Sequence, residues 1–328
     1  MPARLFVVNV GILDRVMMKM HFFTVKKTLL SALSLLCLLL LFVGGPGPYS
    51  LRTFTFAWGL GHLLSFALWG YLYLLWRGAG SFRRLAGEVL LLSLLLGGLT
   101  ELLQAGFGRE ASWVDLGNDL LGAGTALVFS RQRFDWQPLS RLLLQTAVVL
   151  LIGWQLIPFA KVVADDVLAQ QQFPLLSGFE TRLEVSRWGG ACRRQIDVSQ
   201  AYSGARSLRV DLGTQRYAGL ALKHFPADWS GYSRLRFHLY NPANEPFQFY
   251  FRIHDQQHKA SDNRYSDRFN TEFTVPQGWN SLEIDLQEVA AAPKDRQLDL
   301  AKVAGMNIFV GKLAEPFSFY LDEVILLP

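Results

Sequence analysis

Five apolar segments fill most of the first half of the chain, and each is long enough, or nearly so, to cross a lipid bilayer. A spanning helix needs about 20 apolar residues, with a range of roughly 17–25. Because no water reaches the hydrocarbon core, such a segment must satisfy its backbone hydrogen bonds internally, which means a helix. The sequence therefore predicts a transmembrane bundle within residues 28–160, with crossings at 28–43, 55–76, 85–104, 113–130 and 142–159.

Basic residues predict the orientation of these crossings, because positively charged loops stay in the cytoplasm. Three connections are rich in Lys and Arg: residues 1–27, the loop after the second crossing and the loop after the fourth. The alternate connections carry only Arg52 and Arg109. We expect residues 1–27 to be a cytoplasmic arm, with Met17, Met18 or Met20 as possible starts, and the first crossing to be an uncleaved anchor. Five crossings then place residue 161 onward outside the cytoplasm, which for a bacterial inner-membrane protein is the periplasm.

The bulk composition excludes two classes of function. The chain is 51% hydrophobic and 18% charged, with a net charge of +5. The excess of basic residues belongs to the first half and forms no concentrated patch in the second, so we expect no nucleic-acid partner. The two cysteines, Cys37 and Cys192, lie in different halves, which leaves no disulfide framework or metal–thiolate site.

Polar residues cluster near the ends of the predicted crossings, where they are costly unless they pair or serve a function. Glu101 and Gln104 end the third crossing on one helix face, Arg109 follows in a short connection, and His62 lies about two turns into the second crossing. Under the predicted topology, all of these groups lie toward the outer side of the membrane. They could therefore converge at one depth.

A second set of polar residues begins the fourth crossing. Ser112, Asp115, Asn118 and Gly122 recur at spacings of three and four, on one face of a helix. Together with Glu101 and Arg109, they would suit a phosphate or sugar head group, with Glu101 or Asp115 as a general acid or base. The other interpretation is structural, because polar groups at helix ends often cap, pair and join helices. Asp115 would then pair with Arg109 and favour its own helix N-terminus.

Residues 28–135 resemble the VanZ-like membrane proteins. The resemblance is carried by Glu, Gln, Arg, Ser, Asp, Asn and Gly at the family's separations, and by a Gly-His pair in the second crossing. It departs from the family at two positions. Trp58 stands where a Lys before the histidine segment is usual, and Leu63 stands where a Phe directly after the His is usual. The family is associated with resistance to teicoplanin, a glycopeptide antibiotic. The resemblance implies a helical membrane fold and a polar site. The matching residues here are Glu101, Gln104, Arg109, Ser112, Asp115, Asn118, Gly122 and His62.

The second half of the chain has a different periodicity. Residues 161–174 form a polar stretch, which predicts a short helix or linker leaving the membrane. From residue 175 onward, apolar residues alternate with polar ones in short runs separated by Gly, Pro and Asn clusters, which is typical of half-buried antiparallel strands. About eight such strands predict an all-β jelly-roll sandwich over 175–328. The alternating runs are 208–212, 235–239, 247–253, 282–286 and 317–321.

Residues 178–328 resemble jelly-roll carbohydrate-binding and galactose-binding-like modules. The segments that carry the likeness are 201–210, 228–232, 278–280 and 319–324. Related modules often hold a structural calcium, with one acidic ligand on the first strand and another on the last. Glu180 and Asp322 match those places, and carboxylate oxygens are ligands that calcium prefers. The resemblance implies a possible calcium cofactor; the alternative is that both are ordinary surface acids.

A sugar-binding face needs aromatic surfaces flanked by hydrogen-bonding groups. One strand end and the loop after it supply such groups, and Tyr217 could add a stacking surface. The alternative is that this loop is a solvated connection, because aromatic residues at period two more often belong to a core. The glycan-binding candidates are Tyr217, His254, Asp255, Asn263, Tyr265, Asp267 and Arg268.

Three functions remain open at this level. The first is an envelope membrane protein that recognises a glycan or lipid-linked glycan through its β module. The second is an outer-leaflet enzyme acting on a lipid-linked or phosphorylated glycan at Glu101, Arg109, Asp115 and Asn118. The third is a structural subunit of a polysaccharide synthesis or export assembly. The fold does not by itself choose among them.

Overall fold

The computed structural model describes residues 3–42, 45–47, 49–106, 112–130 and 137–328. The chain divides into two compact units. The helical unit comprises residues 1–50 and 54–159, and the sandwich unit comprises Leu51–Thr53 and residues 160–328. The predicted fold class, a set of apolar helices followed by an antiparallel β-sandwich, is confirmed.

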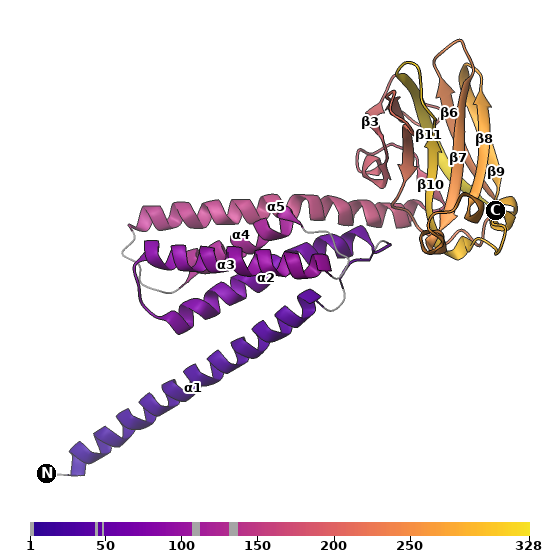
Figure 1. The fold of residues 1–328 in the computed structure, drawn as a ribbon. Coiled ribbons are helices and arrows are strands. Elements are labelled where there is room, and N and C mark those ends of the chain that lie inside the picture. Colours follow the sequence, from indigo (N-terminus) through magenta and orange to yellow (C-terminus); the bar gives the residue numbers. More distant parts are fainter. Residues whose placement is uncertain (1–2, 43–44, 48, 107–111, 131–136) are drawn as a thin grey trace. The chain divides into compact units, whose positions relative to one another are not determined.

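The first part of the chain forms five helices (Figure 1). Among the described residues, four of them are long and apolar enough to cross a membrane. The fourth predicted crossing also forms a helix, but with 17 residues it is shorter and carries more polar groups. The bounds are α1 (Ala3–Phe42), α2 (Arg52–Arg77), α3 (Phe82–Gly106), α4 (Trp113–Phe129) and α5 (Pro138–Gln172).

The stretch at 161–174, predicted as a short helix or linker, is helical as far as Gln172, because α5 continues through it. The stretch is polar, yet Ala, Leu, Lys and Gln are all good helix formers and no glycine interrupts them. The helix ends just before Phe173 and Pro174, where the ring of a proline disfavours helical backbone at the preceding residue. Polarity was therefore a signal of solvent exposure and not of irregular backbone.

Close approach of α4 to its neighbours depends on glycines, which let helix backbones come together. A Cβ built on Gly122 would overlap the Leu63 carbonyl oxygen of α2 and lie 2.9 Å from the Ala67 nitrogen. A Cβ on Gly97 of α3 would lie 2.5 Å from the Asp119 carboxylate of α4. These contacts hold His62, Glu101 and α4 near one another.

Replacing Gly122 with alanine should lower the stability of the helical unit by about 1–3 kcal/mol, since the new methyl group forces α2 and α4 apart. The matched control is Gly124→Ala on the same helix, where an added Cβ meets nothing within 4 Å. That change should be neutral or slightly stabilising, because alanine favours helix over glycine. Titration of the purified chain with SDS in mixed micelles measures both. Equal stabilities for the two variants would contradict the packing described here.

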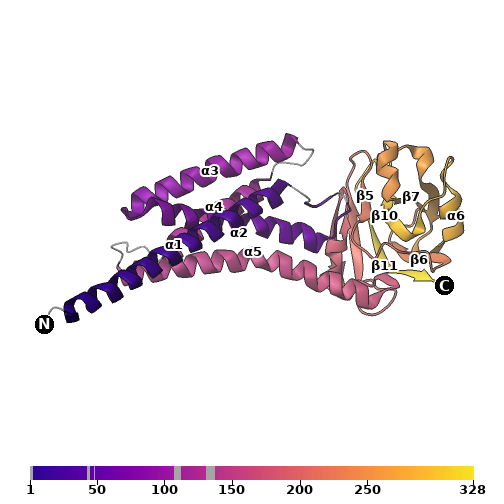
Figure 2. The same ribbon diagram turned by 90° about the horizontal axis from the view of Figure 1, so that it is seen from below.

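The sandwich unit contains two antiparallel sheets whose inner faces share one core (Figures 1 and 2). One sheet has the order β3-β4-β11-β6-β9, with β1 added beside β11, and the other has the order β2-β5-β10-β7-β8. The strands are β1 (Leu175–Ser177), β2 (Trp188–Gly189), β3 (Cys192–Asp197), β4 (Ser207–Leu212), β5 (Gly219–Leu222), β6 (Arg234–Asn241), β7 (Phe247–Asp255), β8 (Phe269–Val275), β9 (Gly278–Asp285), β10 (Val303–Phe309) and β11 (Phe317–Leu327).

The alternating runs of the sequence lie on β4, β6, β7, β9 and β11, as predicted, and their apolar members pack inward. Phe237 of β6 and Phe251 of β7 stack across the core, with ring centroids 5.3 Å apart. One position differs from the strand prediction. Leu286 starts the short helix α6 (Leu286–Ala291), because the Asp285 side chain accepts a hydrogen bond from the Gln287 nitrogen and begins a helical turn there.

Buried charges tie the end of α5 into the sandwich unit. Asp165 is fully buried and accepts hydrogen bonds from Arg52 at 2.5 Å and from Arg187 at 3.0 Å. Arg187, also fully buried, donates to the Leu176 carbonyl oxygen at 2.7 Å and to Gln172 at 3.2 Å. All of these groups belong to the sandwich unit, so Asp165 has a structural role in that unit.

Candidate functional site

The side chains of β7 alternate between the core and the outer face of its sheet. Phe247, Phe249, Phe251 and Ile253 are buried in the core. The residues between them, Gln248, Tyr250, Arg252 and His254, therefore project from the other face, because successive side chains on a strand point to opposite sides. This alternation places an aromatic ring, a guanidinium and an imidazole in one row.

The neighbouring strands extend this row sideways. On β10, Asn307 is paired with Arg252 and Phe309 with Tyr250. On β8, Asn270 is also paired with Arg252. We call the outward side chains of Tyr250, Arg252, His254, Asn270, Asn307 and Phe309 the platform face.

Two aromatic rings and a guanidinium form the centre of the platform face. The rings of Tyr250 and Phe309 lie 5.6 Å apart at an interplanar angle of 32°, and Tyr250 is 46% exposed. Arg252 donates to the Asn307 side-chain oxygen at 2.8 Å, and its guanidinium lies 5.9 Å from the Phe309 ring centroid. The asparagine therefore fixes the guanidinium beside the aromatic pair.

Two guanidinium groups, those of Arg252 and Arg268, lie at the platform face, and the exposed carboxylate of Glu272 lies opposite Tyr250, where it accepts from the Gln248 side chain. Burial lowers the pKa of Arg252, and the positive charge of nearby Arg268 adds to that effect. Burial, followed by the charge of Arg252, lowers the pKa of His254 to about 4, so this imidazole is neutral at pH 7. Neither Arg252 nor Arg268 makes an ion pair with a carboxylate among the described residues. Arg268 instead donates to the Asn270 side-chain oxygen at 2.9 Å.

Some of the predicted glycan-binding residues lie at or beside the platform face, and others are exposed elsewhere on the sandwich unit. His254 lies on the platform face, and Arg268 is linked to it through Asn270. Tyr265 is 71% exposed, with the Arg268 guanidinium 5.3 Å from its ring. Asn263 is exposed in the loop before it, and Tyr217 is 58% exposed next to Arg216, whose guanidinium lies 5.0 Å from the tyrosine ring.

Asp255, another predicted glycan-binding residue, does not lie on the platform face. Its side chain is fully buried and accepts hydrogen bonds from Arg296 at 2.5 and 2.8 Å, and from the backbone nitrogens of His258 and Asp299. Asp267 also accepts from Arg296, at 2.7 and 2.9 Å, which holds its pKa far below the ordinary value. As an inward residue on β7, Asp255 shares the core side with Ile253, so its position in the alternation could have excluded it.

The two acids expected to hold calcium have backbone amide partners. Asp322 is fully buried and accepts from the nitrogens of Tyr202 and Ser203 at 2.8 and 3.0 Å, and Glu180 accepts from those of Ala205 and Arg206 at 2.9 and 3.2 Å. Burial raises the pKa of Asp322. The loop amides donate to Asp322 Oδ2 and to Glu180 Oε1, and the charge of Glu180 adds to the rise in the pKa of Asp322. Both acids therefore shape the 202–206 loop, and a calcium ion held by them stays a prediction.

In the helical unit, three predicted residues come together from three helices. His62 of α2, Glu101 of α3 and Asp115 of α4 each offer a ligand atom within 4.8 Å of the others. A residue that the sequence reasoning missed joins them: Asp119 is fully buried, and its carboxylate lies 3.1 Å from His62 Nδ1. Its spacing of four from Asp115 places it on the same helix face, which was the available signal.

The remaining polar residues of this region have structural contacts. Gln104 donates to the Leu41 carbonyl oxygen at 3.0 Å, and Asn118 donates to Gly59 and accepts from Gln155 at 2.6 Å. Ser112 caps α4 by accepting from the Asp115 nitrogen at 3.2 Å. Arg109 lies outside the described residues. The predicted site is therefore divided into two sets. Gln104, Asn118 and Ser112 join or cap helices, whereas His62, Glu101, Asp115 and Asp119 form one group, which we call the His62 cluster.

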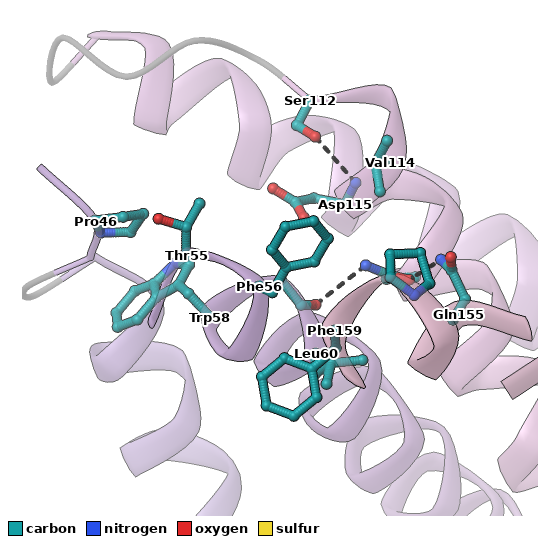
Figure 3. Close-up of a pocket in the computed structure, with 13 residues that line it drawn as sticks. Pro46, Thr55, Phe56, Trp58, Leu60, Ser112, Val114, Asp115, Gln155 and Phe159 are labelled. Carbon is teal, nitrogen blue, oxygen red and sulfur yellow. Dashed lines mark hydrogen bonds between the residues drawn. The ribbon is translucent and has the colours of Figure 1, made fainter. Parts of the chain in front are cut away.

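A pocket of about 250 Å³ adjoins this cluster (Figure 3). Asp115 supplies the charged group of its wall, other polar side chains come from α2, α4 and α5, and apolar and aromatic side chains form the rest. Asp115 is only partly buried, so its carboxylate belongs both to the cluster and to the pocket wall. The lining residues are Pro46, Thr55, Phe56, Trp58, Gly59, Leu60, Ser112, Val114, Asp115, Asn118, Gln155, Pro158 and Phe159.

Comparisons with known proteins give similar structures over the C-terminal β part of the chain. No protein-family model matches the chain, and no curated protein matches it. An exo-β-agarase structure is similar at 20% identity and a TM-score of 0.38, covering 47% of this chain and 24% of the agarase. The family 11 carbohydrate-binding module of Clostridium thermocellum is similar at 17% identity and a TM-score of 0.36, covering 47% of this chain and 94% of the module. A family 30 module from the same organism has 18% identity and a TM-score of 0.34, covering 42% and 88%.

Proposed function

We propose that this chain is a bacterial envelope membrane protein whose sandwich unit binds an acidic glycan on the platform face. The observation that carries the proposal is the Tyr250–Phe309 pair with Arg252 fixed beside it. An aromatic ring presents a flat apolar surface to the C–H groups of a sugar, while amide side chains suit its hydroxyl groups. Such a combination of apolar surface and oriented polar groups is what ligand sites share.

The unpaired guanidinium groups favour an acidic sugar over a neutral one. Arg252 and Arg268 are partly buried cations that no described carboxylate neutralises, and His254 is neutral at pH 7. A guanidinium binds carboxylate or sulfate oxygens through two parallel hydrogen bonds, which adds strength and orientation. A glycan with uronate or sulfate groups would supply the missing negative charge.

The helical unit would anchor this module in the inner membrane. Its long apolar helices and the bias of Lys and Arg between alternate connections support a cytoplasmic N-terminus and a periplasmic sandwich unit. The likeness of residues 28–135 to VanZ-like proteins remains part of this proposal. A lipid-linked glycan would be a natural partner, since one end would lie in the bilayer and the other beside the module.

Binding by the full chain in detergent micelles tests the platform face. The probes are a polyuronate, a sulfated galactan and, as the neutral probe, the β-1,3-1,4-mixed-linked tetrasaccharide named for the family 11 module. We expect the acidic probes to bind, and Tyr250→Ala or Arg252→Ala to weaken binding at least about tenfold, as central aromatic and arginine contacts do. Isothermal titration calorimetry gives the affinities.

The control variant is Tyr320→Ala, which removes a partly buried tyrosine from β11 in the other sheet. It should leave the affinity unchanged. Affinity that is equal in the Tyr250→Ala and Tyr320→Ala variants would exclude the platform face as the site. Tight binding of the neutral tetrasaccharide alone would exclude the role given to the arginines.

A further inference from the structure

We propose that the helical unit holds a divalent transition-metal ion bound by His62, Glu101 and Asp115. This site is separate from the platform face and does not depend on glycan binding. Its three ligand atoms, from α2, α3 and α4, all lie within 4.8 Å of one another. Ligand atoms about 2.0–2.2 Å from one metal ion lie about 3.0–3.5 Å apart, so small side-chain rotations would close the set around an ion.

Unpartnered buried atoms indicate that the cluster is built for a ligand. His62 is 0% exposed and Glu101 is 6% exposed, yet His62 Nε2 and Glu101 Oε1 have no hydrogen-bond partner. A buried polar atom without a partner is destabilising, and more so when it is charged. A metal ion would accept the lone pairs of both atoms at once.

The charge balance points the same way. Glu101, Asp115 and Asp119 are three carboxylates close to one imidazole, and within the described part of the chain none of them forms an ion pair with Lys or Arg. Ionised groups in a membrane protein interior are costly unless an opposite charge compensates them. A divalent cation at this point would compensate two of the negative charges.

Neighbouring groups already orient the proposed ligands. Asp119 lies 3.1 Å from His62 Nδ1, which favours the tautomer that carries its proton there and leaves the Nε2 lone pair for the metal. The Ser112 nitrogen donates to Glu101 Oε2 at 2.6 Å, leaving Oε1 for the ion. Hydrogen bonds that fix a histidine through a carboxylate are the usual support of metal ligands.

The donor set selects the class of metal. Imidazole with carboxylates suits Zn²⁺, Mn²⁺ or Fe²⁺, whereas Ca²⁺ takes six to eight oxygen ligands. Three protein ligands leave at least one coordination position open, as in catalytic sites. Because Asp115 also lines the pocket, that position could take water or an oxygen atom of a ligand bound in the pocket.

The test measures metal binding by the full chain purified in detergent. After treatment with a chelator and removal of the chelator, the protein is titrated with Mn²⁺, read by the electron paramagnetic resonance signal of the free ion, and with Zn²⁺, read by elemental analysis after dialysis. We expect saturable binding of one ion per chain. Glu101→Gln should abolish it, and Asp119→Asn, which leaves all three ligands in place, should weaken it about 10–100-fold.

Glu88→Gln is the matched control, since it makes the same change on the same helix, where the carboxylate pairs with Arg77 and Arg84. It should bind the ion as the natural chain does. Every variant is compared as a monodisperse fraction from size exclusion. The proposal is overturned if the natural chain binds no more metal than detergent alone, or if Glu101→Gln and Glu88→Gln bind it equally.

Discussion

Replacing Asp165 with alanine should lower the free energy of unfolding of the sandwich unit by about 3–5 kcal/mol, the loss typical of breaking a buried ion pair from one side. Asp165 and Arg187 are both fully buried, and Asp165 also accepts from Arg52, which is 8% exposed. Without the carboxylate, Arg187 keeps the Leu176 carbonyl and Gln172, but the nearest remaining carboxylate, that of Glu184, lies 3.9 Å away. A buried guanidinium would thus lose its main counter-charge.

Urea unfolding of the full chain in detergent, followed by tryptophan fluorescence, measures this loss, because Trp188 and Trp229 lie in the core of the sandwich. The neighbouring change Asp166→Ala is the control. That side chain is 29% exposed, and its hydrogen bonds among the described residues are with Arg52 and Thr53, so we expect a loss of about 1 kcal/mol or less. Similar losses for both variants would show that the buried network does not carry the stability assigned to it.

Replacing Arg296 with methionine should lower the free energy of unfolding of the sandwich unit by about 2–4 kcal/mol at pH 7. This loss is slightly smaller than the loss for a fully buried ion pair, because Arg296 is 21% exposed. Its guanidinium holds both Asp255 and Asp267, and methionine keeps much of its apolar stem but none of its five donors. The same fluorescence-detected unfolding applies. The matched change Arg234→Met removes an exposed pair with Glu283 and should change stability by less than about 1 kcal/mol.

This loss should depend on pH in a definite direction. Burial alone would raise the pKa of Asp255, but its bonds from Arg296 and from backbone amides bring it below the ordinary value, and Arg296 lowers the pKa of Asp267 further. A carboxyl whose folded pKa is lowered contributes stability above the unfolded pKa of about 3.9, and that stability is lost as the pH falls below it. The difference between Arg296→Met and the natural chain should therefore shrink from pH 7 to pH 3. A constant difference would contradict the role of the ion pairs.

The periodicity of the sequence predicted most of the fold. Long apolar runs predicted the helices, because a membrane interior leaves the backbone no partner except itself. Alternating runs predicted β4, β6, β7, β9 and β11, because one face of each strand packs on the core. The same reasoning left a short helix or a linker open at residues 161–174, and polar side chains and helical backbone coexist there in the last turns of α5.

Candidate sites were harder to predict, because they depend on which strands and helices become neighbours. The alternation that buried Phe251 also turned Tyr250 and Arg252 outward, but only the pairing of β7 with β10 brings Phe309 and Asn307 beside them. Likewise, Glu101, Asp115 and His62 were identified from their cost in a membrane, whereas their contact rests on the packing of α2, α3 and α4 around Gly97 and Gly122.

The helical and β-sheet halves of this protein, and its costly polar residues, could be identified from the sequence, since hydrophobic period and residue chemistry are local properties. Tertiary structure alone decided which of those residues meet. It separated Gln104 and Asn118, which join helices, from the His62 cluster, and it buried Asp255 under Arg296 while leaving Tyr250 exposed. The physical reason is that contact between residues distant in sequence follows from strand register and helix packing, which depend on the whole core and not on any one segment.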